Sequence, residues 1–409
     1  MSSLPPTPIR SAPKPAPPGG FKSLDWPLAG LYVVIAGFGL LMILSASSLE
    51  ADAEYGDALR YVVRQMAGIG GGVALTAVIV MSPMRWLRKA VWPAFALSLV
   101  GLLMILTPLA HSANGATRWF RLGPVNVQPS EFMKIALVLG FSHYLSLNEG
   151  RLKDPAVLFS SAGLLLIPVL FILPQKDFGT TVILFGLSGV LLFVAGLAWR
   201  WVFAFAGLVG ASLAGLVAIE PYRMQRLVSF LAPFADQGGA GYQVVQGWIA
   251  LATGGLFGQG LASGVAQRGF LPEAHTDFIA AVVGEELGAV GWALMVLMLL
   301  GIVWRALVIA SRSPSLFGML TATGMAALLG AQAIINLGVV GGVMPNKGLV
   351  LPFLSYGASA VLAHTLIVGI LLRISMEAPA KEAVGTSEGK GGFTAPTAEP
   401  PEFTMPMPS

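Results

Sequence analysis

The chain has 409 residues, of which 55% are hydrophobic and 11% are charged, whereas soluble domains carry roughly 25% charged residues. This composition excludes an ordinary soluble protein, the lack of cysteine excludes disulfides and thiolate metal sites, and a net charge of +4 gives nucleic-acid binding no support. The long, uninterrupted apolar runs predict membrane-spanning helices, because a backbone in lipid must satisfy its hydrogen bonds within its own segment.

The two ends of the chain differ from the rest. Residues 1–25 begin with MSSLPPTPIRSAPKPAPPGG, whose prolines are incompatible with a helix and which lacks the apolar core of a signal peptide. Residues 376–409 are polar and contain several glycines and prolines. We expect both ends to be disordered tails and residues 26–375 to form the membrane domain.

The apolar runs between the tails predict an all-α polytopic membrane protein with about ten spans of about 20 residues each. The predicted spans are residues 27–48, 62–81, 91–110, 132–147, 157–174, 179–198, 201–219, 277–304, 316–341 and 353–373. Most connections between them are short. The exceptions are residues 111–131 and 220–276, and the second of these forms a large loop between spans seven and eight.

The distribution of basic residues predicts the orientation in the membrane. The short loop MRWLRK at 84–89 is basic and is therefore expected in the cytoplasm, whereas EADAEYGD at 50–57 is acidic and is expected outside. An even number of spans places both tails in the cytoplasm. Both long connections then face outward.

Four segments on the predicted outer side interrupt the hydrophobic pattern. They are GATRWFRLGPVNVQPSEFMK at 115–134, QKDFGTT at 175–181, GWIALATGGLFGQGLASG followed by LPEAHTDF between 247 and 278, and GVMPNKGLVLPFLSYGAS at 342–359. In this order and spacing they resemble the SEDS family (shape, elongation, division and sporulation proteins), and its division-type branch, FtsW, more than its elongation-type branch, RodA. The sequence departs from the family at Lys176, where proline is usual, and at Ala358, where a second glycine is usual.

The resemblance implies a ten-span peptidoglycan glycosyltransferase that polymerises lipid II into glycan strands outside the bacterial cytoplasmic (inner) membrane, at the division septum. It also implies a complex with a class B penicillin-binding protein, the transpeptidase that crosslinks the strands, among other divisome membrane proteins and membrane lipids. The alternatives are an elongation-type polymerase, a flippase for lipid II, and a division scaffold without activity of its own. A flippase needs polar groups through the depth of the membrane, whereas the motifs here crowd the outer face.

Polymerisation of lipid II inverts one sugar carbon, so it requires an in-line displacement with a base for the attacking hydroxyl and cations for the departing pyrophosphate. Asp277 follows Pro272 at the outer end of the eighth predicted span, where a helix N-terminus favours an ionised carboxylate. An aspartate in a first helical turn is often only a cap. The family's catalytic aspartate falls on Asp277, which makes it the predicted catalytic base.

Further polar residues are predicted to bind the substrate. Arg118 and Lys134 are expected near the pyrophosphate with Glu131 orienting them, although Glu131 and Lys134 lie three residues apart on one helix face and could simply pair. Asp177 begins a span and is either a helix cap or a site residue.

Two loop residues complete the predicted substrate-binding set. Lys347 lies between Pro345 and Gly348 in a rigid loop and is expected to bind phosphate. His275 is included as a site residue, although it could equally be a loop histidine with its hydrogen bonds satisfied. Mg²⁺ or Mn²⁺ could bridge the pyrophosphate, but the sequence shows no closed ligand set, so no cofactor is assigned.

Glu285 and Glu286 stand inside the eighth predicted span. In a helix that includes Asp277, Glu285 would lie about 80° further round the axis and roughly 12 Å deeper, with Glu286 on the opposite side. A carboxylate in lipid is costly, so each is expected to face the protein interior with a partner and to serve structure more than chemistry. The glycine-rich residues 254–264 follow no strand and lack a phosphate-binding lysine, so they are expected to allow close backbone approach or loop mobility.

Overall fold

The computed structural model describes residues 20–378 apart from 109, 114–115, 123–124, 220, 236–238, 266–268 and 347. The predictions for most of the two tails and for Lys347 therefore lie outside the described residues. The helices are α1 (Trp26–Tyr55), α2 (Arg60–Met81), α3 (Met84–Met104), α4 (Pro129–Leu147), α5 (Pro155–Ile172), α6 (Phe178–Val194), α7 (Trp199–Ile219), α8 (Pro221–Leu231), α9 (Ala240–Gly254), α10 (Ile279–Arg312), α11 (Leu316–Val340) and α12 (Ala358–Ser375).

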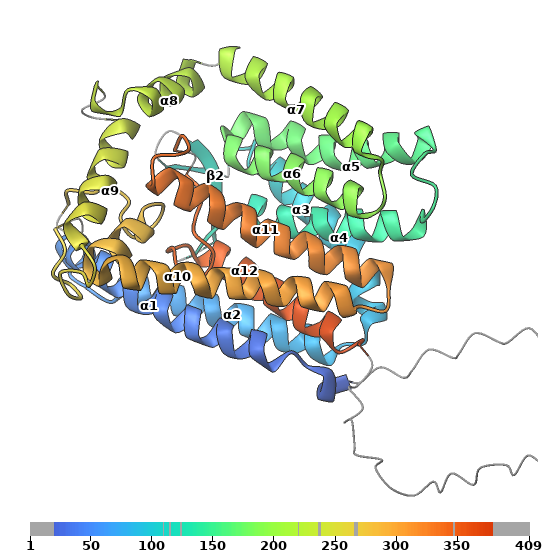
Figure 1. The fold of residues 1–409 in the computed structure, drawn as a ribbon, viewed down its shortest axis with the longest axis horizontal. Coiled ribbons are helices and arrows are strands. Elements are labelled where there is room, and N and C mark those ends of the chain that lie inside the picture. The colour runs from blue at the N-terminus through green and yellow to red at the C-terminus, as the bar shows by residue number, and fades with distance from the viewer. Residues whose placement is uncertain are drawn as a thin grey trace, which may run out of the picture.

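The long helices form a bundle with α11 near its middle. Figure 1 shows α1, α2, α10 and α12 along one side of α11, α3 to α6 along the other, and α7 at the margin with α8 and α9 turning round the end of the bundle. Each predicted span overlaps one of these helices. Within the described part of the chain, seven helices are long and apolar enough to cross a membrane, namely α1, α2, α3, α5, α10, α11 and α12. The total of ten spans stays a prediction.

Several helices are preceded by a polar residue that caps their first turn. Asp25 accepts a hydrogen bond from the backbone of α1, Asp154 from α5, Asp177 from α6 and Ser315 from α11. Such caps satisfy N–H groups that a first turn leaves without an intrahelical partner. The starts of these helices are thus fixed by local chemistry as well as by hydrophobicity.

The all-α prediction is wrong between α3 and α4. A three-stranded antiparallel sheet occupies this connection, with strands β1 (Ala110–Ala113), β2 (Ala116–Leu122) and β3 (Val125–Val127) in the order β1-β2-β3. Phe120 pairs with Val127 in the β2–β3 register. The sheet matters to the site because β2 carries Arg118.

The sheet also shortens the third predicted span. We expected a helix over 91–110, but α3 ends at Met104. The segment ATRWFRL contains a β-branched residue and two aromatic residues, which favour a strand, and the nearby sequence pair Asn114-Gly115 is typical of hairpins. These strand signals are present in the sequence. The predicted helix over 91–110 was based on the length of the apolar run and did not take them into account.

The helix α12 packs closely against α2 because glycines of α2 leave room for it. A Cβ atom on Gly72 would lie 2.6 Å from Cβ of Thr365, and a Cβ on Gly68 would lie 2.7 Å from Cγ1 of Val361. Real Cβ atoms do not approach so closely, so these two positions require glycine. The close packing holds the beginning of α12 and the loop before it against α2.

A break divides α10, and it is filled by the glycine-rich segment. Gly288 has φ 66° and ψ −166°, which are not helical values. The freed backbone groups bond to that segment: Gln259 N donates to Glu285 O at 3.0 Å, and Ala289 N donates to Gly255 O at 2.9 Å. The alternative of close backbone approach for residues 254–264 is therefore confirmed.

Glu285 and Glu286 lie inside the protein, each with a partner, as predicted. Glu286 is fully buried and accepts from Ser45 Oγ at 2.6 and 2.8 Å, and Glu285 accepts from Val265 N at 2.8 Å. The expected rotation from Asp277 to these residues is wrong, because α10 begins only at Ile279 and its helical path does not include Asp277.

Candidate active site

Asp277 lies in the turn-rich segment that precedes α10. The residue at the cap position of α10 is Phe278, so Asp277 is neither this cap nor a member of the first helical turn. Its side chain is half-buried. The cap alternative that the sequence left open therefore does not describe Asp277.

The carboxylate of Asp277 and the guanidinium of Arg118 both border the space beside Gly348. A Cβ atom on Gly348 would lie 3.3 Å from Oδ2 of Asp277 and 3.9 Å from Nη1 of Arg118, and the φ of Gly348 is +62°. A side chain at this position would fill the space next to the carboxylate and would strain the backbone. Segments from three distant parts of the sequence thus converge at one point.

The surroundings of Asp277 raise its pKa from the ordinary 3.8 to about 6. Burial is the main cause, and the negative charge of Glu273 adds to it, while the charges of Arg118, Arg226 and His275 act in the opposite direction. We expected a helix N-terminus to favour the ionised form, and this expectation is wrong because burial outweighs it. A pKa near 6 leaves the group ionised at neutral pH and close to the optimum for a general base.

Arg118 is held in place by the turn before α6. Its Nε donates to Gln175 O at 3.3 Å and its Nη2 donates to Lys176 O at 2.5 Å. Lys176, where the sequence departs from the family, has φ 55°, so the turn that presents its carbonyl is left-handed at this residue. The side chain of Arg118 is buried and its position is fixed before any substrate binds.

Arg226 of α8 was not among the predicted site residues. Its Nη1 donates to Asn346 O at 3.0 Å, and Asn346 in turn donates through Nδ2 to Gln243 Oε1 of α9 at 2.9 Å. Asn346 Oδ1 also accepts from Gly348 N at 3.0 Å. The residues on either side of Lys347 are therefore anchored to α8 and α9. The only available sequence signal for Arg226 was a basic residue in the predicted outer loop.

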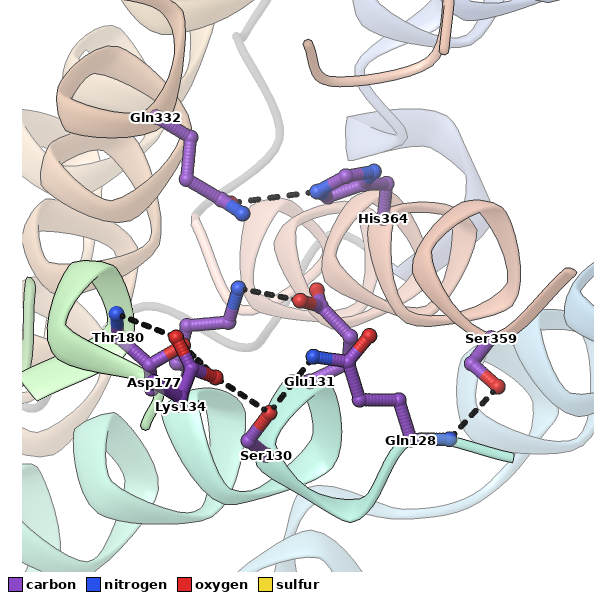
Figure 2. Close-up of polar contacts among 9 residues, drawn as sticks. All are labelled: Gln128, Ser130, Glu131, Lys134, Asp177, Thr180, Gln332, Ser359 and His364. Atoms are coloured by element: carbon purple, nitrogen blue, oxygen red, sulfur yellow. Dashed lines mark hydrogen bonds and ion pairs between the residues drawn. The ribbon is translucent and has the colours of Figure 1, made fainter. Parts of the chain in front are cut away.

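Glu131 and Lys134 form an ion pair inside the bundle. Lys134 Nζ lies 2.7 Å from Glu131 Oε1, and the side chains are 1% and 5% exposed. Figure 2 shows the two side chains pointing toward one another from α4. The pairing that the spacing suggested is confirmed, and it occurs where an unpaired charge would be very costly.

Asp177 acts as the cap of α6. It accepts from Thr180 N at 3.1 Å, from Thr180 Oγ1 at 2.8 Å and from Ser130 Oγ at 3.3 Å, as Figure 2 shows. The cap alternative is therefore confirmed, and the side chain also ties α6 to α4. Lys176 precedes Asp177 and accepts a hydrogen bond from Arg118 through its carbonyl. The turn before α6 therefore connects Ser130, the neighbour of Glu131, with Arg118.

Two buried residues beside Lys134 were missed. His364 of α12 has Nε2 3.2 Å from Gln332 Oε1 of α11, and both side chains are buried (Figure 2). The charge of Lys134 acts on His364. The sequence shows that His364 and Gln332 are polar residues within apolar helices. It does not show that they contact one another across the bundle.

His275 packs among aromatic side chains. The centre of its ring lies 4.7 Å from that of Tyr61 and 5.6 Å from that of Tyr356, and Nδ1 lies 3.3 Å from Glu50 Oε2. These contacts connect the loop to α1 and α2, and they favour a packing role over substrate binding. Among the residues that the structure describes, no group of three or more His, Asp or Glu side chains could hold a metal ion.

Comparisons with known proteins agree with the motifs. Residues 26–380 match the family model for FtsW, RodA and SpoVE, described as cell cycle protein. A relative from Allochromatium vinosum, named probable peptidoglycan glycosyltransferase FtsW, is 38% identical over 364 residues that cover 86% of this chain and 90% of the relative. A relative of the same name from Hahella chejuensis is 38% identical over 366 residues, covering 88% and 92%.

Solved structures show the same fold. A chain described under "Structural coordination of polymerization and crosslinking by a peptidoglycan synthase complex" is 29% identical, with a TM-score of 0.71 over 86% of this chain and 97% of that chain. The rod shape determining protein RodA of Thermus thermophilus is 28% identical, with a TM-score of 0.63 over 87% and 97%. The chain is therefore an integral membrane protein of the FtsW/RodA/SpoVE family, the SEDS family that its four polar segments resemble.

Proposed function

We propose that this protein is a peptidoglycan glycosyltransferase that polymerises lipid II into glycan strands during septal cell-wall synthesis. The names of its relatives support the activity and the division-type role. The observation that carries the proposal is the half-buried carboxylate of Asp277, whose pKa is raised to about 6 and which shares the space beside Gly348 with the guanidinium of Arg118. A base near its optimal pKa and a cation at the same point are what the reaction requires.

In the proposed reaction, a hydroxyl of the acceptor sugar attacks the anomeric carbon of the donor. The bond from that carbon to the pyrophosphate oxygen breaks, the hydroxyl proton passes to the carboxylate of Asp277, and undecaprenyl pyrophosphate leaves. The attack and the departure occur on opposite faces, so the configuration inverts. No covalent intermediate with the protein is needed.

The basic residues supply charge for the departing pyrophosphate. Arg118 uses Nε and Nη2 to bind carbonyls, so Nη1 remains directed toward the space beside Gly348. Arg226 acts on Asp277 from α8. Lys134 and the sequence-predicted Lys347 complete this set in the proposal, with Lys134 oriented by Glu131.

A divalent cation would be compatible with this arrangement. The charges of Asp277 and Glu273 act on one another, and Mg²⁺ is often held by one or two carboxylates together with substrate phosphates. When bound, Mg²⁺ or Mn²⁺ would supply further positive charge to the pyrophosphate. The proton transfer to Asp277 does not depend on it.

The proposal includes the membrane setting and the partners. We place the protein in the inner membrane at the septum, with both tails in the cytoplasm and with ten spans. The related synthase complex coordinates polymerisation and crosslinking, which supports a complex with a class B penicillin-binding protein. Other divisome membrane proteins belong to the same expectation.

The test is a polymerisation assay with purified protein, its cognate transpeptidase and lipid II. Asp277→Asn keeps the shape of the side chain and removes the proton acceptor, so the initial rate should fall by roughly 10²–10⁴ with little change in lipid II affinity. Asp154→Asn is a matched control, because Asp154 is an exposed cap of α5 paired with Arg151. An Asp277→Asn variant that polymerises at the wild-type rate would exclude Asp277 as the base.

The same assay separates the alternatives. A flippase would move lipid II between leaflets and form no glycan polymer from it in detergent. A scaffold would leave polymerisation by the complex unaffected by Asp277→Asn. If Asp277→Asn forms no polymer while the control variant Asp154→Asn does, the activity resides in this chain.

A further inference from the structure

The backbone that leads to Asp277 is held by the C-terminal part of the chain. Three successive carbonyl oxygens each accept a hydrogen bond from a different donor. The bonds are Tyr356 N to His275 O at 2.9 Å, Ser355 Oγ to Thr276 O at 2.6 Å, and Asn336 Nδ2 to Asp277 O at 2.8 Å. The segment is thus fixed residue by residue although it belongs to no helix or strand.

Asn336 of α11 makes a second bond with the same amide group. Its Nδ2 donates to Leu349 O at 2.7 Å, and the side chain is 2% exposed. One buried amide therefore joins the backbone of Asp277 to the segment that carries Gly348. Because a carboxylate lies only two rotatable bonds from its backbone, the position of the Asp277 carbonyl largely sets where the carboxylate points.

We infer that Asn336 is a positioning residue for the catalytic base, which holds the carboxylate of Asp277 in register with Gly348 and Leu349. This inference rests on the proposed function. The distance between the base and a substrate bound beside Gly348 then depends on one side chain that touches neither the substrate nor the reacting atoms. Catalytic geometry must be held within about 0.5 Å, which explains the use of a buried amide with both protons engaged.

The neighbouring bonds make the role of Asn336 separable from folding. The loop at 355–357 is braced independently by Gln65 of α2, whose Nε2 donates to Ser355 O at 3.1 Å and whose Oε1 accepts from Gly357 N at 3.0 Å. The bonds of Ser355 and Tyr356 to the segment therefore remain when Asn336 is replaced. Loss of Asn336 should free the Asp277 peptide while the rest of the segment stays in place.

The test compares Asn336→Leu and Asn336→Ser with wild type in the full-length protein and its transpeptidase complex. Leu keeps a branched side chain with the same number of heavy atoms and removes both donors, and Ser is too short to reach both carbonyls. Polymerisation should fall by roughly 10²-fold in each, as for a misplacement of about 1 Å, with lipid II affinity nearly unchanged. Freed from its buried position, Asp277 should also titrate closer to an ordinary aspartate, so the acidic limb of the pH–rate profile should move to lower pH.

A double-variant measurement distinguishes positioning from general damage. In the Asp277→Asn background, Asn336→Leu should cause little further loss, because the base through which it acts is already gone. Thr76→Val is the control: Thr76 Oγ1 donates to Thr365 O at 3.0 Å and joins α2 to α12. This variant removes a side-chain-to-carbonyl bond of the same kind and should keep the wild-type rate.

The outcomes separate this inference from the proposed function. Lack of polymerisation by the wild type, or full activity of Asp277→Asn, would count against the proposed function. If Asp277→Asn is inactive, but a folded Asn336→Leu or Asn336→Ser has the wild-type rate and pH profile, the positioning role is refuted. Losses that add fully in the double variant would refute it as well.

Discussion

At the scale of single residues, Asp277 combines two properties that oppose one another. Burial makes its carboxylate a better base by raising the pKa to about 6, and the same burial makes the ionised form costly in the folded protein. The pKa of the folded state lies above the ordinary value of 3.8. The protonated carboxyl of Asp277 therefore contributes fully to the free energy of unfolding below the ordinary pKa. This contribution is lost as the pH rises through about 6.

This relation predicts that Asp277→Asn is more stable than wild type at neutral pH. The shift corresponds to an upper limit on the order of 3 kcal/mol in the free energy of unfolding. Thermal unfolding in detergent should show a higher Tm for the variant, and the difference should shrink as the pH is lowered toward 4. An equal Tm at every pH would mean that the carboxylate of the wild type is well solvated.

The same pKa predicts the pH dependence of the reaction. Only the ionised carboxylate accepts a proton, so the rate should fall as the pH drops through about 6 and then by about tenfold per pH unit. Initial polymerisation rates at lipid II concentrations well below KM, which report the pKa of the ligand-free enzyme, would measure this limb. A limb near the ordinary aspartate value would contradict the buried environment described for Asp277.

The buried pair of Glu131 and Lys134 allows structure and activity to be separated. Glu131→Gln leaves the ammonium of Lys134 without its partner, and loss of one member of a buried pair costs about 3–5 kcal/mol. The double variant Glu131→Gln with Lys134→Met removes both charges and should recover much of the Tm. If Lys134 also serves the pyrophosphate, polymerisation should stay low in this stable double variant. Recovery of the rate together with the Tm would assign the pair to structure alone.

At the scale of elements, the sequence predicted what depends on local apolar length and missed what depends on distant contacts. The long apolar runs placed a helix at each predicted span. The start of α10 was predicted two residues too early, at 277 instead of Ile279, and the bond from Asn336 Nδ2 to Asp277 O holds this residue outside the helix. The break at Gly288 depends in the same way on a segment about thirty residues earlier in the chain.

The break in α10 predicts an unusual sensitivity to a single methyl group. A Cβ on Gly258, which has φ +79°, would overlap the backbone of Glu286. Gly258→Ala should therefore displace residues 255–260 from the break, lower the Tm and increase hydrogen exchange at Gln259 and Gly260. Gly163→Ala in α5 is the matched control, because nothing lies within 4 Å of its added Cβ. That control should be neutral or stabilising by up to about 1 kcal/mol.

At the scale of the whole molecule, the family resemblance predicted the catalytic base, but it did not predict the contacts that hold this residue in place. The sequence predicted catalytic or substrate-binding roles for Asp277, Arg118, Glu131, Lys134 and Asp177, and those roles stay predictions. The hydrogen bonds of Asn336, Arg226 and Gln65 could not be predicted, because each is a single polar residue whose partner lies far away in the sequence. Their roles follow from packing, which a single sequence does not contain.

The topology supports a prediction at this scale as well. A reporter fused after residue 240 should be extracytoplasmic, and one fused after Lys381 should be cytoplasmic. Paired reporters that are active only outside or only inside the cytoplasm would measure this directly. The reverse pattern would place Asp277 on the wrong side of the membrane for polymerisation of an exported substrate.

The bracing of Asp277 by residues near the C-terminus has a consequence for biogenesis. During synthesis, the ion pair of Glu131 and Lys134 joins residues three positions apart, so it can form as soon as α4 enters the bilayer. Asp277 emerges much later, and Tyr356, Ser355 and Asn336 emerge later still. A nascent or truncated chain that ends before them therefore carries the base without its supports. The order of translation thus leaves the proposed base without these supports until α12 has been synthesised and has joined the bundle.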